Sequence, residues 1–204
     1  GVFRRFIETK NVPSFILWGP PGVGKTTLAR IVAAELGRPF YTLSAVTSGV
    51  KEVREVIGYD VPLAIDHFGH ICVEDCIRFA RRMEPYNIAW MEDMVPWMYT
   101  DQYVRMRNST TIPVCTGEDI YLKEGFETLI KAGGVSVIHP DILTCGGALE
   151  LKKIADIADE YGVATAVHMA ESPVACMAAV HTAAATVRSV QPSNGMLGRT
   201  SRLK

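Results

Sequence analysis

The sequence predicts an α/β fold with a parallel sheet of β/α repeats. We expect a barrel-like sheet of seven or eight strands that begins with a P-loop unit at the N-terminus, and an open doubly wound sheet is the alternative. Two observations predict this class. Short apolar runs alternate with segments in which apolar residues recur every three or four positions, as in parallel sheets covered by helices. Acidic residues also close several of these runs at a nearly constant spacing.

Seven apolar runs are the strand candidates, and each has the length of a buried strand. They are Phe15–Trp18, Phe40–Leu43, Pro62–Asp66, Ile88–Glu92, Pro113–Gly117, Val135–His139 and Val163–His168. A closed β/α barrel has eight strands. The run Val187–Val190 is a weak candidate for the eighth.

Helical periodicity fills the segments between these runs. The predicted helices are Thr27–Leu36, Val50–Ile57, Val73–Met83, Leu122–Ala132 and Leu149–Tyr161. Gly162 stands just past the last of them, where a glycine commonly ends a helix. An alanine-rich run at Ala178–Ala185 is also helical in character.

Three parts follow from these patterns. Residues 1–57 form a P-loop βαβα segment, residues 58–187 a β/α half-barrel, and residues 188–204 a basic, flexible tail. The tail contains cations but no acidic residue, and Pro192 and Gly195 interrupt it, which is typical of a disordered end. We expect the first two parts to be fused into one domain.

Composition argues against several classes of protein. The net charge of −1 argues against a partner that is a nucleic acid or another polyanion. No apolar run is long enough to cross a membrane, and none resembles a signal peptide. The five cysteines form no CxxC pair, which predicts reduced thiols and a cytoplasmic location. The sequence leaves the oligomeric state open, and a homo-oligomer is one expectation.

A phosphate-binding motif stands near the N-terminus. The stretch Gly19–Thr26 matches the pattern G-x-x-x-x-G-K-[ST] between an apolar run and a helical run. In such a loop the backbone N–H groups and the helix N-terminus bind phosphate, the lysine contacts the β- and γ-phosphates, and the threonine binds Mg²⁺. The predicted nucleotide-binding residues are Gly19, Gly22, Gly24, Lys25, Thr26 and Thr27.

This part resembles the start of the AAA+ ATPase module of the replication-associated recombination protein family, which is related to clamp-loader ATPases. The resemblance covers residues 1–57 and includes the stretch Ser44–Glu55. It implies ATP as a cofactor and a nucleotide as a partner. An ATPase of this type needs a strand that ends in Asp-Glu. The nearest candidate ends in Asp66 followed by His67, so we expect no efficient ATP hydrolysis.

A ladder of polar residues follows the later apolar runs. Its members are Asp66, Glu92, Glu118, Asp141 and His168, separated by 26, 26, 23 and 27 residues. Residues at the C-terminal ends of consecutive parallel strands point into one shared mouth. Three carboxylates that converge there repel one another unless a cation lies among them, and hard oxygen ligands suit Mg²⁺. The other interpretation is that each acid caps a helix or lies on the surface.

These strand ends resemble the barrel of the enolase superfamily. The stretches that carry the resemblance are Ala64–His70, Trp90–Asp93, Thr116–Asp119, His139–Asp141 and Ala166–Ala170. The nearest branch is the mandelate racemase-like one, which includes sugar-acid dehydratases. The resemblance covers about residues 50–187.

The resemblance implies that Asp66, Glu92 and Glu118 are Mg²⁺ ligands and that Asp141 and His168 form a catalytic dyad. The implied chemistry is lyase- or racemase-like: removal of the proton next to the carboxylate of a hydroxy-acid or sugar-acid substrate. The family's second-strand lysines and its N-terminal capping domain have no match in these 204 residues. An inactive barrel is therefore a further expectation.

Two other interpretations stay open. One is an ATP-binding P-loop domain of AAA+ type that relies on Lys25 and Thr26. The other is an engineered or recombined chimera with no reaction of its own, in which the two parts join within Val50–Gly58.

Overall fold

The computed structural model describes most of the chain. The described residues are 2–12, 17, 20, 22–43, 48–67, 69, 71–170 and 172–186. Contacts between residues divide the chain into two compact units, Gly1–Val56 and Ile57–Lys204.

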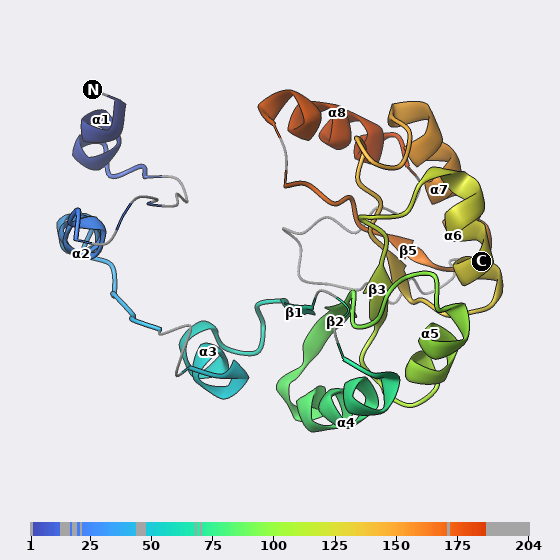
Figure 1. The fold of residues 1–204 in the computed structure, drawn as a ribbon. Helices are drawn as coiled ribbons and strands as arrows, with labels where there is room; N and C mark the ends of the chain where they lie inside the picture. The colour runs from blue at the N-terminus through green and yellow to red at the C-terminus, as the bar shows by residue number, and fades with distance from the viewer. Residues whose placement is uncertain are drawn as a thin grey trace, which may run out of the picture. The chain divides into compact units, whose positions relative to one another are not determined.

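The first unit is helical in its described residues. Its helices are α1 (Val2–Glu8), α2 (Lys25–Glu35) and α3 (Val50–Ile57) (Figure 1). Helix α2 begins after Gly24, whose φ of 82° lies in the left-handed region that favours glycine. Helix α3 follows Gly49, whose backbone N–H donates to the Glu52 carboxylate at 2.8 Å. A glutamate that reaches back in this way is half of a capping box, and α3 has the predicted bounds.

The strand predicted at Phe40–Leu43 is wrong. These residues have no regular structure, and their large side chains are exposed. A strand needs a partner to satisfy its backbone groups, and in the described part of the chain nothing pairs with this segment. The predicted strand Phe15–Trp18 lies outside the described residues except for Leu17, which is in no strand. The candidate Val187–Val190 and the tail at 188–204 also lie outside them.

The second unit is built on a parallel sheet. Its strands are β1 (Leu63–Asp66), β2 (Ile88–Glu92), β3 (Val114–Thr116), β4 (Val137–Ile138) and β5 (Ala164–Thr165). They lie side by side in chain order, which is the order of a β/α barrel, whereas a doubly wound sheet reverses its order at a switch point. The parallel α/β class is therefore confirmed. The described residues hold five strands rather than the predicted seven or eight.

Helices follow the strands and pack one beside the next (Figure 1). They are α4 (Val73–Met83), α5 (Thr100–Arg107), α6 (Leu122–Lys131), α7 (Ala148–Glu160) and α8 (Pro173–Ala184), with a short 3₁₀ helix η1 (Glu84–Tyr86). Helix α4 has the predicted bounds, and α6 and α7 lie within one residue of theirs. Helix α5 was missed because only Tyr103 and Met106 in it are buried, too few to show a period.

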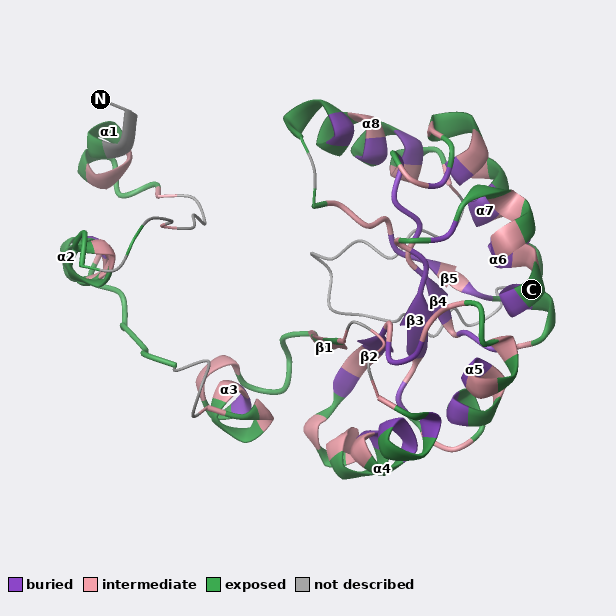
Figure 2. Cartoon of the chain, viewed as in Figure 1, coloured by how far each residue is buried: buried purple, intermediate pink, exposed green. Residues whose placement is uncertain are grey.

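The two faces of the sheet carry different residues, because neighbours on a strand point to opposite faces. Met91, Val114 and Ile138 lie on one face, and all three are fully buried. Figure 2 shows β3 and β4 as buried. The other face carries Glu92 and its register partner Cys115 on β2 and β3. The polar residues at the strand ends continue from this second face.

Candidate active site

The polar residues predicted from the sequence gather at the C-terminal edge of the sheet. Asp66 and Glu92 end β1 and β2 and are register partners. Glu118 lies two residues past β3. Asp141 and His168, which follow β4 and β5, form a parallel backbone bridge. The phase of the ladder therefore brings side chains from all five strands to one edge, as predicted.

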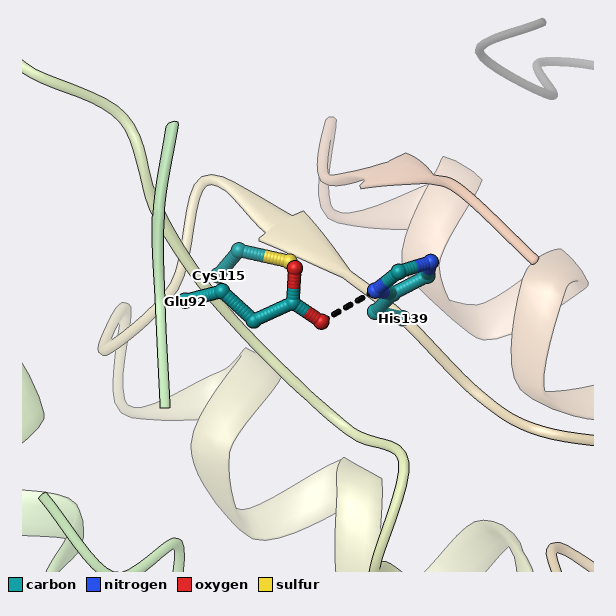
Figure 3. A group of neighbouring side chains, drawn as sticks. All are labelled: Glu92, Cys115 and His139. Atoms are coloured by element: carbon teal, nitrogen blue, oxygen red, sulfur yellow. Dashed lines mark hydrogen bonds and ion pairs between the residues drawn. The ribbon is translucent and has the colours of Figure 1, made fainter. Parts of the chain in front are cut away.

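Glu92 is a buried carboxylate with two hydrogen-bonding partners. Its side chain is 7% exposed. The Trp90 indole Nε1–H donates to its Oε2 at 2.9 Å, and His139 Nδ1 contacts its Oε1 (Figure 3). Burial raises the pKa of Glu92, but the contacts with His139 and Trp90 together outweigh burial and hold this pKa below its usual value. Glu92 is thus ionised and oriented near neutral pH.

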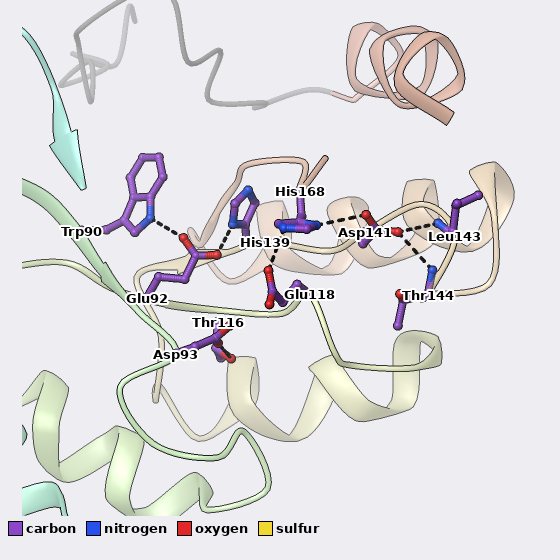
Figure 4. A network of polar contacts seen from close by, with 10 residues as sticks. All are labelled: Trp90, Glu92, Asp93, Thr116, Glu118, His139, Asp141, Leu143, Thr144 and His168. Carbon is purple, nitrogen blue, oxygen red and sulfur yellow. Dashed lines mark hydrogen bonds and ion pairs between the residues drawn. The ribbon is translucent and has the colours of Figure 1, made fainter. Parts of the chain in front are cut away.

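His168 lies between two carboxylates. Its Nδ1 is 3.0 Å from Asp141 Oδ2, and its Nε2 is 2.7 Å from Glu118 Oε2 (Figure 4). Burial lowers the pKa of His168, but the hydrogen bond to Asp141 and the charges of Glu118 and Asp141 raise it more, so the net shift is upward. Because each ring nitrogen contacts a carboxylate, the orientation of the His168 ring is fixed.

Asp141 is itself held by the backbone. The carboxylate is 2% exposed, and its Oδ1 accepts from the N–H groups of Leu143 and Thr144 at 2.7 and 3.2 Å. Its other oxygen, Oδ2, is the one that faces His168. An acid fixed in this way can orient a histidine and stabilise the charged imidazolium, which are the two roles of the aspartate in a catalytic triad.

Asp93 departs from the expectation for a strand neighbour, which is to point away from Glu92. Its φ of 47° is left-handed, so the extended geometry ends here. As a result, oxygen atoms of Glu92, Asp93 and Glu118 all lie within 4.8 Å of one another. Burial and the charges of Glu92, Glu118 and Asp66 raise the pKa of Asp93 to about 6, against a smaller lowering by the hydroxyl of Thr116.

Asp66 is exposed and lies outside that compact group. It is nevertheless close enough to affect Glu118. Burial raises the pKa of Glu118 most, and the charge of Asp66 raises it further, against a lowering by the charge of His168. The structure thus brings Glu92 and Glu118 together and leaves Asp66 at the neighbouring strand end. Clustered carboxylates can hold a hard cation such as Mg²⁺.

The predicted phosphate loop belongs to the first unit. Gly22 and Gly24 both have a φ of 82°, and the helix after them starts at Lys25. The Lys25 ammonium donates to the carbonyl of Pro20 at 2.6 Å. Thr26 and Thr27 lie in the first turn of α2, and Gly19 lies outside the described residues. A nucleotide-binding role for these residues stays a prediction, as does the interpretation of the chain as a chimera.

A comparison with protein families identifies the family of the larger part of the chain. The sequence profile described as enolase C-terminal domain-like matches residues 29–195, which include all five strands. The chain belongs to the enolase C-terminal domain-like family. The match begins inside α2, so it leaves out the phosphate loop and takes in residues 29–57, which we expected to resemble the ATPase module.

Relatives of this enolase-type chain include two sugar-acid dehydratases. The D-xylonate dehydratase of Haloferax volcanii is 36% identical over 141 residues, which are 69% of this chain and 34% of that protein. The D-galactonate dehydratase of Ralstonia pickettii is 31% identical over 139 residues, which are 68% of this chain and 36% of that protein. The chain therefore spans about a third of the length of the curated relatives it matches.

Solved structures also resemble this enolase-type chain. The mandelate racemase/muconate lactonizing enzyme-like protein from Rubrobacter xylanophilus is 38% identical with a TM-score of 0.68, over 69% of this chain and 36% of that one. The 3,6-anhydro-D-galactonate cycloisomerase from Zobellia galactanivorans is 38% identical with a TM-score of 0.66, over 69% of this chain and 40% of that one. The resemblance to the enolase superfamily is confirmed. Among the described residues of this enolase-type chain, no helix has the length and apolar character needed to span a bilayer.

Sequence reasoning missed two members of the site. His139 was not among the predicted site residues, and it contacts Glu92. Cys115 is a buried core residue, and its sulfur also lies within 4.8 Å of the ligand atoms of Glu92 and His139. Side chains alternate between the two faces of a strand, and this alternation could have placed both residues on the face of Glu92. Glu92 and Cys115 are register partners, and His139 lies two residues past Val137, the register partner of Cys115.

Proposed function

We propose that this chain carries the metal- and proton-handling part of an enolase-superfamily enzyme that removes the proton next to the carboxylate of a sugar acid. One observation carries the proposal: His168 is held between Asp141 and Glu118, at 3.0 and 2.7 Å, at the edge where the other acids gather. A histidine oriented by one buried acid, next to a carboxylate cluster, suits general base catalysis beside a divalent cation.

Asp66, Glu92 and Glu118 are the residues proposed to hold Mg²⁺. Their donor atoms are all carboxylate oxygens, the ligand type that Mg²⁺ prefers. The pKa of Glu118 is raised by burial and by the charges of Asp66 and Glu92, against a lowering by the charge of His168, which supports a site where carboxylates are crowded together. Bound Mg²⁺ would stabilise the negative charge that develops on a substrate carboxylate when its neighbouring carbon loses a proton. Asp93 lies close enough to join the ligands or to orient them.

His168 is proposed to take the substrate proton on Nε2, after this nitrogen has given up its contact with the Glu118 carboxylate. Its Nδ1 stays paired with Asp141, which fixes the tautomer and stabilises the ring once it carries the proton. In a dehydratase, loss of the hydroxyl group from the next carbon then uses one proton and releases water. In a racemase, the proton returns to the other face of the same carbon.

The substrate class is proposed from the relatives. Two of them are named for D-xylonate and D-galactonate. Both are straight-chain sugar acids with a hydroxyl group on every carbon except that of the carboxylate. Because the chain spans about a third of those proteins, the activity of the whole enzyme is part of the proposal.

Proton exchange tests this function directly. The chain is incubated with D-xylonate or D-galactonate in D₂O with Mg²⁺, and loss of the signal of the hydrogen next to the carboxylate is followed by proton NMR. We expect exchange in the parent chain and none in His168→Asn. His181→Asn, an exposed histidine on α8, is the matched control and should retain exchange. Exchange that survives in His168→Asn would count against the proposal.

Binding of Mg²⁺ is tested separately by thermal unfolding. A ligand at about 100 times its dissociation constant adds about 2.7 kcal/mol of stability. We expect such a shift with Mg²⁺ alone in the parent chain, and a smaller one in Asp66→Asn and Glu118→Gln. Equal shifts in all three proteins would show that these carboxylates are not the ligands.

A further inference from the structure

A second set of metal-binding side chains lies on the polar face of the sheet. Cys115 on β3 is the register partner of Glu92 on β2, and His139 follows β4. One ligand atom from each of these residues lies within 4.8 Å of the other two. Figure 3 shows the thiol of Cys115 and the ring of His139 on either side of the Glu92 carboxylate group.

We propose that Glu92, Cys115 and His139 form a binding site for a thiophilic divalent cation of the Zn²⁺ class. Sulfur, imidazole nitrogen and carboxylate oxygen are the three donors that Zn²⁺ takes, whereas Mg²⁺ takes oxygen. Bond lengths to tetrahedral Zn²⁺ place its ligand atoms roughly 3.4–3.6 Å apart. The observed ligand atoms lie within 4.8 Å of one another, and to reach that geometry His139 and Glu92 must move apart to admit the ion.

The thiol of Cys115 is buried beside the other two side chains. The residue is 0% exposed, and no hydrogen bond of its thiol is found among the described residues. The buried thiol of Cys76 is different, since it donates to the carbonyl of Met94 at 3.4 Å. Cys115 also packs against Val137 and Ala166, as a plain buried cysteine would. Packing alone does not place a histidine and a glutamate beside the sulfur.

Binding of the cation needs no co-reactant. The cation replaces the direct contact between His139 and Glu92, the Cys115 thiol releases its proton to solvent, and the sulfur binds the metal as thiolate. His139 offers the route of entry, because its side chain is 16% exposed while that of Glu92 is 7% exposed. Glu92 is also a proposed ligand of Mg²⁺, so the two cations compete for one carboxylate.

Cobalt spectroscopy tests the site, since Co²⁺ substitutes for Zn²⁺ and a Co–thiolate bond gives a charge-transfer band in the near ultraviolet. We expect this band when Co²⁺ is added to the parent chain and its loss when Zn²⁺ follows. Cys115→Ser should abolish the band. His139→Ala should weaken Co²⁺ binding by about tenfold or more. Cys145→Ser is the matched control, because Cys145 is also 0% exposed but lies outside the group.

Two results would overturn the proposal. One is a folded parent chain that binds Co²⁺ without the thiolate band. The other is a band that persists in Cys115→Ser and disappears when the exposed Cys72 and Cys176 are replaced by serine. If Cys115→Ser does not fold, as judged by its thermal transition, Cys115→Ala and His139→Ala give the same comparison.

The test also separates this site from the proposed Mg²⁺ site. Asp66→Asn should weaken Mg²⁺ binding and leave the thiolate band intact. Cys115→Ser should remove the band and leave the Mg²⁺-induced melting shift intact. Glu92→Gln should weaken both, because Glu92 is the ligand that the two sites share.

Discussion

Asp141 and His168 are joined twice, through a parallel backbone bridge and through a contact of 3.0 Å between Oδ2 and Nδ1. They lie 27 residues apart in the chain, at the ends of neighbouring strands. The backbone N–H groups that hold the other oxygen of Asp141 leave this acid little freedom. Consequently the ring of His168 is fixed by the sheet itself, and its Nε2 faces Glu118.

The first prediction concerns this pair. In Asp141→Asn the negative charge that raises the pKa of His168 is lost, so this pKa should fall in the metal-free protein. Proton NMR titration of the histidine ring measures the change. The rate of proton exchange in a sugar acid should fall by about 10²–10⁴-fold, the usual contribution of acid–base groups.

Asp156→Asn is the control for this variant. Asp156 pairs with Lys152 on the surface of α7, and its side chain is 47% exposed. Its replacement should leave both the His168 pKa and the exchange rate unchanged. An unchanged His168 titration in Asp141→Asn would mean that the acid does not govern the histidine.

The second prediction concerns Asp93 and the stability of the metal-free protein. Its pKa in the folded state is raised to about 6, from about 3.9 in an unfolded chain. Between these two values the folded state binds more protons than the unfolded state, so stability falls as the pH rises through this window. Above pH 6 the ionised Asp93 therefore destabilises the fold by about 1–3 kcal/mol.

Asp93→Asn removes this charge and keeps an oxygen that can accept from the Thr116 hydroxyl. Urea unfolding in the presence of a chelator should show a variant more stable than the parent near pH 7.5. The two proteins should converge near pH 4, where the aspartate of the folded parent is protonated. A stability difference that is the same at both pH values would contradict this origin.

Local sequence determines much of the fold. Periodicity of apolar residues is enough to fix α3 and α4 at their observed bounds, because apolar residues recur every three or four positions along each of them. It fails at Phe40–Leu43, where the run is apolar but has no partner strand among the described residues. Strand formation depends on partners distant in the chain, which a local pattern does not contain.

The site shows the same division between local and long-range information. Spacing predicts that Asp66, Glu92 and Glu118 reach one edge, since each β/α unit has a similar length. It does not predict the left-handed backbone at Asp93, which turns that acid toward the other two. The contact between His139 and Glu92 depends on the register between strands, which sequence spacing alone does not specify.

The third prediction concerns the reactivity of the five cysteines. Burial raises the pKa of Cys76 and of Cys145 to about 11 and holds that of Cys115 well above its usual value, so little thiolate forms at neutral pH. Cys72 and Cys176 are exposed. A disulfide reagent should therefore modify two thiols quickly in the native protein and all five in denaturant. Cys72→Ser should remove one fast thiol, Cys115→Ser should remove none, and the reverse pattern would contradict the observed burial.

The last prediction concerns Gly117, which immediately precedes Glu118. A Cβ at this position would lie 2.8 Å from the backbone nitrogen of His139 and 2.9 Å from Cε1 of Phe126, and its φ of 153° disfavours other residues. Gly117→Ala must therefore push β3 and the segment after β4 apart. We expect a loss of about 1–3 kcal/mol in the free energy of unfolding.

Because Glu118 and His139 are carried on the two segments that separate, the same variant should also weaken the binding of Mg²⁺ and of Co²⁺. Gly162→Ala provides the comparison: Gly162 has a φ of 71°, but a Cβ there meets nothing within 4 Å. It should lower stability through backbone strain and leave both metal affinities unchanged. If Gly117→Ala were to bind both cations as the parent does, the close approach of Gly117 to His139 would have no part in shaping the site.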